Sequence, residues 1–462
     1  MLLRRDVIYS MFSLIHHRRL FVLAAVLLIL GSIAHFGQPK TIWKHGSASN
    51  IDTFKPTWKH AALGTPNIDI LKPTILTSKV QWAVDNRKAI FDLNRCLEVG
   101  NCAENQTKVV IIASPEFISY KQGGYIGGEV IWAASTLNAL TNMGYTIAYA
   151  ETHQAAVALH HILDPLVKMV VFNPEQAFTC FQTGTCVRSE GNPMGIPASR
   201  MFSFCFWSGG DGVSPLGPGW SLAPEPLSTA PFLGYSIEPQ CSTRNFIPHT
   251  KRKRQAWLLG KYLHAFHPNK TAWPPEFYDA AAEELKMSFA TAAVSERGGP
   301  FPKMSKTITN LVKPGETVLN QDEFYEQLSH SKVLVGLGDP IISPTPYDAL
   351  CFGVPFINVI KLWDKTNPND TTRWSTQHDG LRNLGPPFVY HVFAFDKRGF
   401  VDALRGALEN PIDSYILPRM RMSAVEQRLG ALLQHDWEKD ARDLLERRRR
   451  GEEKGPLFYV DP

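Results

Sequence analysis

From residue 108 onward, short apolar runs alternate with stretches whose apolar residues recur at helical spacing. This alternation predicts parallel strands with helices as the connections between them. It occurs as two series, separated at 206–240 by a stretch rich in glycine, proline and serine. The predicted strands lie at 109–113, 145–149, 167–172, 256–259, 289–294, 333–335, 355–360 and 388–395. The predicted helices lie at 76–95, 129–143, 153–162, 275–287, 321–331, 398–408 and within 418–449.

The two series predict an α/β protein with two Rossmann-like domains, at 108–245 and 246–435. A C-terminal helix and tail follow at 436–462. A long irregular segment such as 206–240 is usually a linker or a functional loop. Because ligands of α/β proteins bind at the carboxyl ends of strands and between domains, we expect the binding site in a cleft between the two.

The N-terminal part is different in character. Residues 20–36 form an uncharged apolar run that is slightly shorter than a typical membrane span. Four arginines precede it, which favours a membrane anchor with a cytosolic tail at 1–19. Residues 37–107 are then a stem and lead-in to the folded part. The alternative is a cleaved signal peptide, because Ser32-Ile33-Ala34 resembles a cleavage site.

Composition narrows the functional classes only a little. The 462 residues carry a formal net charge of +5, much of it in local runs, so the charge gives no case for nucleic-acid binding. The run at 251–254 (KRKR) is typical of a solvated surface, with a cleavage site for a secretory protease as the alternative. No zinc-type cysteine spacing, HExxH motif or Walker loop is present in the sequence.

Cysteines and sequons indicate a lumenal location. Two close pairs, Cys96/Cys102 and Cys180/Cys186, lie in loop-like sequence and can close short disulfide loops in an oxidising compartment. Elimination suggests Cys205/Cys241 as a third pair, and leaves Cys351 as a buried thiol inside a helix. Three N-glycosylation sequons are present, at Asn105, Asn269 and Asn369. With the apolar run, these features predict a secretory protein.

The stretch 332–360 has the clearest functional pattern. A buried strand ends at two glycines, Gly336 and Gly338, and a short helix follows that begins near Ser343 and Thr345. Asp348 lies in its first turn, where an acid is suited to bind a ribose hydroxyl. A strand, a glycine turn and a helix start form an anion site at the edge of a parallel sheet. The pattern therefore predicts a nucleotide-sugar pocket.

This stretch resembles the catalytic-domain signature of the N-acetylglucosaminyltransferase V family (alpha-1,6-mannosylglycoprotein 6-beta-N-acetylglucosaminyltransferases, glycosyltransferase family 18). Four further segments match in the same order, so that the resemblance spans roughly residues 108 to 435. Asp348 replaces the family's glutamate, Ser343 replaces a glycine, and Lys361 is one place off the usual lysine. The matching residues in the stretch are Gly336-Leu337-Gly338-Asp339-Pro340, Ser343-Pro344-Thr345-Pro346, Tyr347-Asp348-Ala349, Gly353 and Phe356-Ile357-Asn358. The further segments are Gly127-Gly128-Glu129-Val130 with Asn142-Met143-Gly144-Tyr145, Phe232-Leu233-Gly234-Tyr235, Leu259-Gly260-Lys261, and Gln377-His378 through Phe388.

The resemblance implies a GT-B fold and an inverting transfer of N-acetylglucosamine from UDP-N-acetylglucosamine. The acceptor it implies is a mannose of a glycoprotein N-glycan, in β1,6 linkage. It also implies a Golgi enzyme of type II, held in the membrane by one helix with its catalytic part in the lumen. Two alternatives stay open: a GT-B transferase with another nucleotide sugar or acceptor, and an inactive secretory carbohydrate-binding protein.

Such a reaction requires a general base for the acceptor hydroxyl and electrostatic support for the departing diphosphate. Glu129 is the candidate base, because it begins a helix after glycines that permit close approach to a ligand. The alternative is an ordinary first-turn glutamate favoured by the helix dipole. Glu116 and Glu151 also follow strands of the first series and are the fallback candidates.

The donor would be bound by residues of the second series. Lys261 follows a strand end and would offset phosphate charge, although a solvated surface lysine has the same sequence signal. His378 would bind a phosphate or sugar, although an ordinary loop histidine is equally consistent. The chain has no Asp-x-Asp motif, so we expect a reaction without metal or other cofactor. The candidate donor-binding residues are Lys261, Gly338, Ser343, Thr345, Asp348, Lys361 and His378.

Overall fold

The structure is a computed structural model. It describes residues 80–123, 127–206, 213–295, 302–313 and 316–461. The predicted cytosolic tail, the predicted anchor at 20–36 and the stem up to residue 79 lie outside these ranges. Within them, no helix combines the length and the apolar character that crossing a membrane requires.

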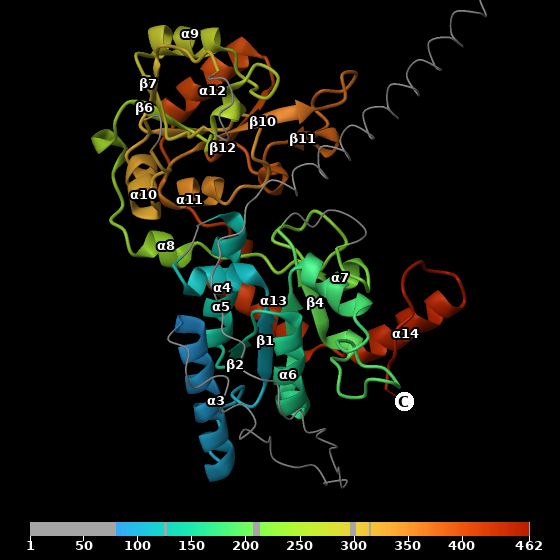
Figure 1. The fold of residues 1–462 in the computed structure, drawn as a ribbon. Helices are drawn as coiled ribbons and strands as arrows, with labels where there is room; N and C mark the ends of the chain where they lie inside the picture. The colour runs from blue at the N-terminus through green and yellow to red at the C-terminus, as the bar shows by residue number, and fades with distance from the viewer. Residues whose placement is uncertain (1–79, 124–126, 207–212, 296–301, 314–315, 462) are drawn as a thin grey trace, which may run out of the picture. The chain divides into compact units, whose positions relative to one another are not determined.

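The first series forms a five-stranded sheet in which every pairing is parallel, in the order β2-β1-β3-β4-β5. All five residues of β1 are buried, which is why its sequence is a continuous apolar run. The strands are β1 (Val109–Ala113), β2 (Thr146–Tyr149), β3 (Val167–Phe172), β4 (Met201–Phe204) and β5 (Ser221–Leu222). The helices are α3 (Gln81–Val99), α4 (Pro115–Lys121), α5 (Gly128–Asn142), α6 (His153–Leu163) and α7 (Pro174–Gln182) (Figure 1).

The second series forms a second sheet, whose parallel strands run in the order β8-β7-β6-β9-β10-β12. The two-residue β11 (Ser375–Thr376) pairs antiparallel with β10. The parallel strands are β6 (Gln255–Leu258), β7 (Ser288–Thr291), β8 (Ile308–Asn310), β9 (Val333–Val335), β10 (Phe356–Leu362) and β12 (Val389–Phe393). The helices are α8 (Glu238–Ser242), which precedes the sheet, α9 (Pro275–Leu285), α10 (Gln321–Ser329), α11 (Thr345–Cys351) and α12 (Lys397–Glu409).

These two parallel sheets confirm the predicted α/β class. Counted along the chain, the parallel strands of the second sheet stand in the order 3-2-1-4-5-6, which is the order of dinucleotide-binding sheets. The strand order reverses between β6 and β9, and this reversal creates the topological switch point at which such sheets bind ligands. The loops after β6 and β9 therefore form the candidate ligand-binding site of the second sheet.

The last two helices, α13 (Met422–Gln434) and α14 (Trp437–Arg449), return to the first sheet. Helix α13 packs beside α5 (Figure 1), and Asn142 at the end of α5 donates to the Glu426 carboxylate at 2.8 Å. Trp437 lies against Phe202 and Trp220, with ring centroids 4.8 and 5.5 Å away. The end of the chain thus completes the packing of its beginning.

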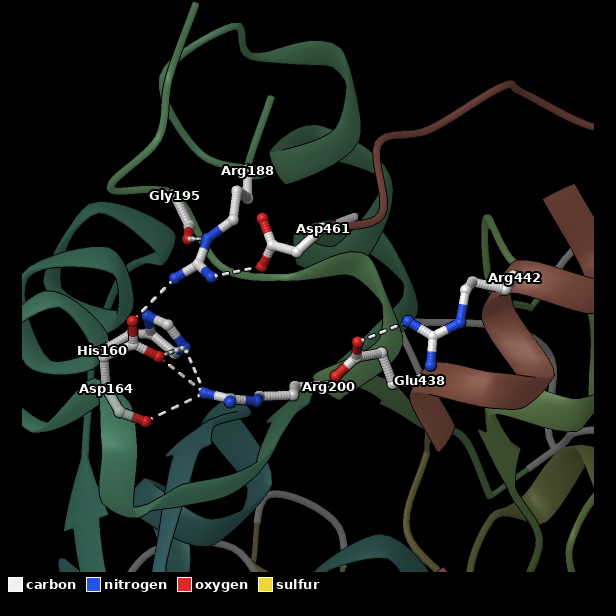
Figure 2. A network of polar contacts seen from close by, with 8 residues as sticks. All are labelled: His160, Asp164, Arg188, Gly195, Arg200, Glu438, Arg442 and Asp461. Carbon is white, nitrogen blue, oxygen red and sulfur yellow. Dashed lines mark hydrogen bonds and ion pairs between the residues drawn. The ribbon is translucent and has the colours of Figure 1, made fainter. Parts of the chain in front are cut away.

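A polar network also holds the end of the chain to the first half. Figure 2 shows the Asp164 carboxylate between Arg188 and Arg200, at 2.8 and 2.7 Å. Arg188 also binds Asp461, at 2.8 Å. Asp164 is the first residue of the short turn that leads into β3, and Arg200 immediately precedes β4, so the network lies at the amino ends of these strands. Ligand sites of parallel sheets lie at the opposite ends, and we assign the network a structural role.

Two of the three predicted disulfides are present, Cys96–Cys102 and Cys180–Cys186. The prediction for the third was wrong: Cys241 is bonded to Cys351, not to Cys205. Cys351 is therefore not a thiol. The error arose because Cys351 lies inside α11, and its partner on α8 is brought beside it only by the tertiary fold.

Candidate functional site

The switch point of the second sheet is built from two loops that pack closely. Gly260 follows β6, and a Cβ atom there would lie 2.8 Å from the Phe266 ring and 2.9 Å from the Leu337 side chain. Only glycine fits at such distances. Thr291 donates its hydroxyl to the Gly260 carbonyl at 3.1 Å and fixes the same turn. The carboxyl ends of β6 and β9 are thus held side by side without bulky side chains between them.

The glycine loop after β9 is fixed from beneath by Gln377. Its side-chain oxygen accepts from the Gly338 amide at 2.9 Å, and its amide donates to the Pro340 carbonyl at 3.1 Å. Gly338 has φ 111°, a conformation that favours glycine. Trp273 donates to the Gly336 carbonyl at 2.6 Å. The sequence placed Gln377 in a segment that carries the family resemblance but gave it no role, because its role depends on this long-range pairing.

Helix α11 starts after Ser343, as predicted, but it has only seven residues. The Ser343 hydroxyl lies 3.3 Å from the Thr345 hydroxyl, and both residues are partly exposed. They are therefore accessible to a ligand at the switch point. A helix this short contributes little dipole, so its start alone does not make an anion site.

Asp348 occupies a different environment from the one expected for a ribose ligand. Its side chain is only 2% exposed, and Tyr325 of α10 donates to its carboxylate at 3.4 Å. Burial raises the pKa of Asp348 to about 8, while the Tyr325 hydrogen bond opposes that shift. In this structure the carboxyl therefore faces Tyr325 and is mostly protonated at neutral pH.

His378 lies beneath the same loops and is 1% exposed. Asn358 fixes its backbone by accepting from the His378 amide at 3.0 Å and donating to its carbonyl at 3.2 Å. Neither ring nitrogen has a hydrogen-bond partner of normal geometry among the described residues, although the ring lies against the Ser343 backbone. Burial lowers the pKa of His378 to about 3, and Arg419 lowers it further, so the ring is neutral.

Two lysines lie at this edge of the sheet. Lys361, near the end of β10, is 3.6 Å from the Asp339 carboxylate and is partly exposed. Lys261 follows β6; burial lowers the pKa of its ammonium, while Tyr262 and Glu129 oppose that shift. Glu129, at the start of α5, thus acts electrostatically on Lys261. The predicted base of the first half and the predicted phosphate ligand of the second are therefore within electrostatic range of one another.

Among the described residues, the fallback candidates for the general base, Glu116 and Glu151, have no interaction with the second sheet. Glu116, in the first turn of α4, accepts a hydrogen bond from Ser114 of its own loop. Glu151 is exposed in the bend after β2. Neither has a contact with the second sheet within the ranges that the structure describes, and Glu129 stays the leading candidate.

One buried acid near the site was missed. Glu225 follows β5 and is 3% exposed, yet it accepts a hydrogen bond from the Tyr347 hydroxyl of α11 at 2.6 Å. Arg419, from the short turn η9 (Pro418–Met420), donates to the same hydroxyl at 3.1 Å. The sequence around Glu225 is proline-rich and gives no sign of these contacts.

The described residues include no group of three or more histidine, cysteine, aspartate or glutamate side chains placed to hold a metal ion. What the site offers is one lysine near a glutamate, a second lysine, two hydroxyls, a neutral histidine and a glycine loop open to close approach. This set can bind a phosphorylated ligand and hold a carboxylate beside it.

Residues 226–442 match the sequence model of glycosyltransferase family 18. This part of the chain, called the family 18 domain below, is similar to family 18 glycosyltransferases. The match confirms the predicted resemblance over this part of the chain. The family 18 domain contains the whole second sheet, both lysines, the glycine loop and α11, so the switch-point edge lies inside it.

The curated relatives are alpha-1,6-mannosylglycoprotein 6-beta-N-acetylglucosaminyltransferases. The rat enzyme A is 23% identical over 238 residues, which cover 46% of this chain and 30% of the relative. The enzyme of Caenorhabditis elegans is 26% identical over 98 residues, covering 20% and 15%. The chain thus matches less than a third of these relatives' length.

Solved structures give a weaker likeness. The glycosyltransferase SnogD from Streptomyces nogalater is 16% identical, with a TM-score of 0.30 over 71% of this chain and 99% of its own. The UDP-GlcNAc 2-epimerase from Methanocaldococcus jannaschii is 10% identical, with a TM-score of 0.29 over 77% and 82%. TM-scores this low support no structural conclusion.

Proposed function

We propose that the protein is an inverting glycosyltransferase that moves N-acetylglucosamine from UDP-N-acetylglucosamine to a mannose of an N-glycan in β1,6 linkage. The observation that carries the proposal is the family 18 domain, whose second sheet has the dinucleotide-binding strand order with Lys261 and the glycine loop at its switch point. The GT-B organisation predicted from the sequence is part of this proposal.

In the proposed reaction the UDP diphosphate lies along the glycine loop, where Gly338 permits close approach of the backbone. Lys261 offsets the charge that develops on the departing diphosphate, and Lys361 assists from β10. Ser343 and Thr345 donate their hydroxyls, and the neutral His378 donates from beneath. Asp348 reaches Tyr325 in this structure, so its role as ribose ligand remains a prediction from the sequence.

Glu129 is the proposed general base. It takes the proton from the acceptor hydroxyl as that oxygen attacks the anomeric carbon of the donor, on the face opposite the leaving UDP. Its electrostatic interaction with Lys261 supports a position within the candidate site. The proton then resides on Glu129 until solvent removes it.

The test is to incubate the wild-type protein with UDP-N-acetylglucosamine and a biantennary N-glycan, and to determine the linkage of the product. Glu129→Gln should bind UDP normally and lose transfer by at least ~100-fold, because a glutamine accepts no proton. Glu104→Gln, on the exposed surface, is the matched control. Wild-type turnover in Glu129→Gln would remove Glu129 from the mechanism.

The same transfer assay also tests whether the reaction needs a metal ion. We expect transfer to persist in EDTA, since the residues of the site supply the charge stabilisation; loss with EDTA and recovery with manganese would contradict this.

We also propose a Golgi membrane protein of type II, with a lumenal catalytic part. Retention of full-length protein in Golgi membranes, and its protection from added protease, would support that location. The sequons at Asn269 and Asn369 are exposed, while Asn105 donates to the Met143 carbonyl, so the first two are the proposed glycan sites.

A second candidate is the same chemistry with another nucleotide sugar or acceptor. The observation that favours it is Asp348, an acid at the family's glutamate position that is buried and turned toward Tyr325. A thermal-shift panel of nucleotide sugars distinguishes the two, because a ligand that binds the native state raises the melting temperature. Stabilisation by UDP or its sugar supports the two transferase interpretations, and no stabilisation by any nucleotide sugar would instead support an inactive carbohydrate-binding protein.

A further inference from the structure

Glu225 is a residue of the first half whose carboxyl lies among elements of the second. It follows β5, and its segment is fixed by Ala223, whose amide donates to the Pro231 carbonyl at 2.9 Å. The Ala223 carbonyl in turn accepts from the Leu233 amide at 2.9 Å. From this anchored segment the Glu225 side chain extends into a fully buried position, 3% exposed.

Three segments meet at the Glu225 carboxyl. Tyr347 of α11 donates to one oxygen at 2.6 Å, and the Arg419 guanidinium lies 3.8 Å from the other. Arg419 also donates to the Tyr347 hydroxyl at 3.1 Å and to the Gly380 carbonyl. Gly380 itself packs against Glu225, since a Cβ atom there would clash with the carboxylate and lie 2.9 Å from the Tyr347 hydroxyl.

These segments border the proposed donor site on two sides. Tyr347 lies two residues after Thr345 on the same short helix. Gly380 lies two residues after His378, whose ring meets the Tyr347 ring edge-on with centroids 5.0 Å apart. A shift of the Glu225 carboxyl would therefore move the hydroxyl-bearing start of α11 and the histidine loop together.

We infer that Glu225 is a positioning residue for the donor site: its carboxyl fixes α11 through Tyr347 and the 378–380 loop through Arg419, and so sets the affinity for the nucleotide. This inference rests on the proposed function. It adds a residue outside the second sheet to the determinants of donor binding, and it makes donor binding depend on contact between the two halves.

The ionisation of Glu225 gives a readout specific to this arrangement. Burial raises its pKa to about 7, while Tyr347 and Arg419 oppose that shift. Burial and the Glu225 charge raise the pKa of Tyr235 and Tyr347, and Asp348 also faces Tyr235. His378 is the remaining titratable neighbour and is neutral over the range considered. A group whose folded pKa is raised stabilises the fold fully below its ordinary pKa, and this contribution is lost as pH rises through the folded value.

The experiment measures UDP affinity and melting temperature for the full chain and its variants. Glu225→Ala should weaken UDP binding about tenfold or more, because Tyr347 loses its buried acceptor and Arg419 loses its ion-pair partner. Tyr347→Phe should weaken it similarly, and the double variant should show less than the sum of both effects. Glu225→Gln keeps an acceptor for Tyr347 and should retain affinity within about threefold, while removing the fall in stability between pH 5 and 8 that ionisation of Glu225 causes.

Glu238 offers a matched control. It also links the segment before the second sheet to the returning chain, since its carboxylate accepts from the Met422 amide at 2.6 Å, but it has no contact with Tyr347 or Gly380 among the described residues. Glu238→Ala should lower the melting temperature and leave UDP affinity unchanged. A parallel loss of UDP affinity in Glu238→Ala would mean that any break between these segments suffices, and would overturn the specific role of Glu225.

The outcomes separate the inference from the function on which it rests. If wild-type protein binds no UDP, the proposed function fails before any variant is made. If wild type binds UDP and the folded Glu225→Ala and Tyr347→Phe variants bind it equally well, only the inference fails. Should Glu225→Ala not fold, Tyr347→Phe decides, because it removes one hydroxyl and keeps the ring.

Discussion

At the scale of single residues, the candidate site is underlain by two buried acids. Glu225 and Asp348 each have a raised pKa, to about 7 and about 8, because burial disfavours the charged form. Each has a tyrosine as its hydrogen-bond donor, Tyr347 and Tyr325. Two buried carboxyl groups beside the candidate site are therefore partly protonated near neutral pH, so the stability of this region depends on pH.

Asp348 gives a direct test of this dependence. Its folded pKa is raised, so the stability it contributes is present below about pH 4 and is lost as pH rises through about 8. We expect wild type to lose roughly 1 kcal/mol per pH unit from this group between pH 5 and 8. Asp348→Asn should reduce the total slope in urea titrations by that amount and leave the part that Glu225 contributes, while the exposed Asp413→Asn keeps the wild-type slope. Identical slopes in all three proteins would contradict the burial of Asp348.

Arg252 shows why single residues were hard to predict. The run 251–254 was expected to be a solvated face, yet Arg252 is 4% exposed. Its guanidinium donates to the carbonyls of Phe352 and Gly353, which follow α11, and to the Ile247 carbonyl. Four consecutive basic residues look alike in a sequence; which of them is buried is decided by a helix a hundred residues away.

At the scale of elements, prediction succeeded where burial is continuous. Strands β1, β3 and β9 lie at the predicted residues, because strands buried on both faces are mostly apolar; of these three, only β3 has an exposed polar residue, Lys168. Short helices such as α4 and α7 were missed, since a few polar turns carry no period. Strand β5 was missed because it has two residues within glycine- and proline-rich sequence.

The residues of the candidate site also fall into those that local sequence predicts and those that it does not. Lys261, Gly338 and Ser343 were found because they follow strand ends, and strand ends can be located from local sequence. Gln377, Glu225 and Arg419 act through partners far along the chain, from 39 residues for Gln377 and Gly338 to 122 for Glu225 and Tyr347. No local pattern marks such residues, and only the tertiary structure places them.

A substitution of Gln377 tests the site at the scale of elements, because this one side chain fixes the glycine loop after β9 at Gly338 and Pro340. Gln377→Ala leaves the Gly338 amide and the Pro340 carbonyl without this partner, which should cost about 1–3 kcal/mol of stability and weaken UDP binding. Thermal unfolding and UDP titration measure the two effects. Gln81→Ala, on the exposed face of α3, should change neither. Normal UDP affinity in Gln377→Ala would show that the loop holds its shape unaided.

At the scale of the whole molecule, the disulfide Cys241–Cys351 joins α8, which precedes the second sheet, to α11 at the candidate site. It spans 110 residues of sequence, whereas Cys96–Cys102 spans six. In the chain-entropy account a longer closed loop restricts the unfolded chain more. The bond therefore stabilises the family 18 domain and anchors the helix that carries Tyr347.

Replacing Cys241 and Cys351 together with serine should lower the free energy of unfolding by about 4 kcal/mol, and replacing Cys96 and Cys102 should lower it less. Guanidinium unfolding under non-reducing conditions measures both. Peptide mapping without reduction should recover the Cys241 and Cys351 peptides linked. A Cys205–Cys241 peptide would instead restore the pairing that elimination suggested.

The return of α13 and α14 to the first sheet has a consequence for how the protein is made. Trp437 and Asn142 with Glu426 complete the packing around α5 and β4, yet Trp437 and Glu426 follow the second sheet along the chain and are synthesised after it. The first sheet therefore waits for the entire second sheet to be synthesised before its own surface is covered. Until then the apolar side chains that Trp437 covers are exposed on the nascent chain, a state that favours aggregation.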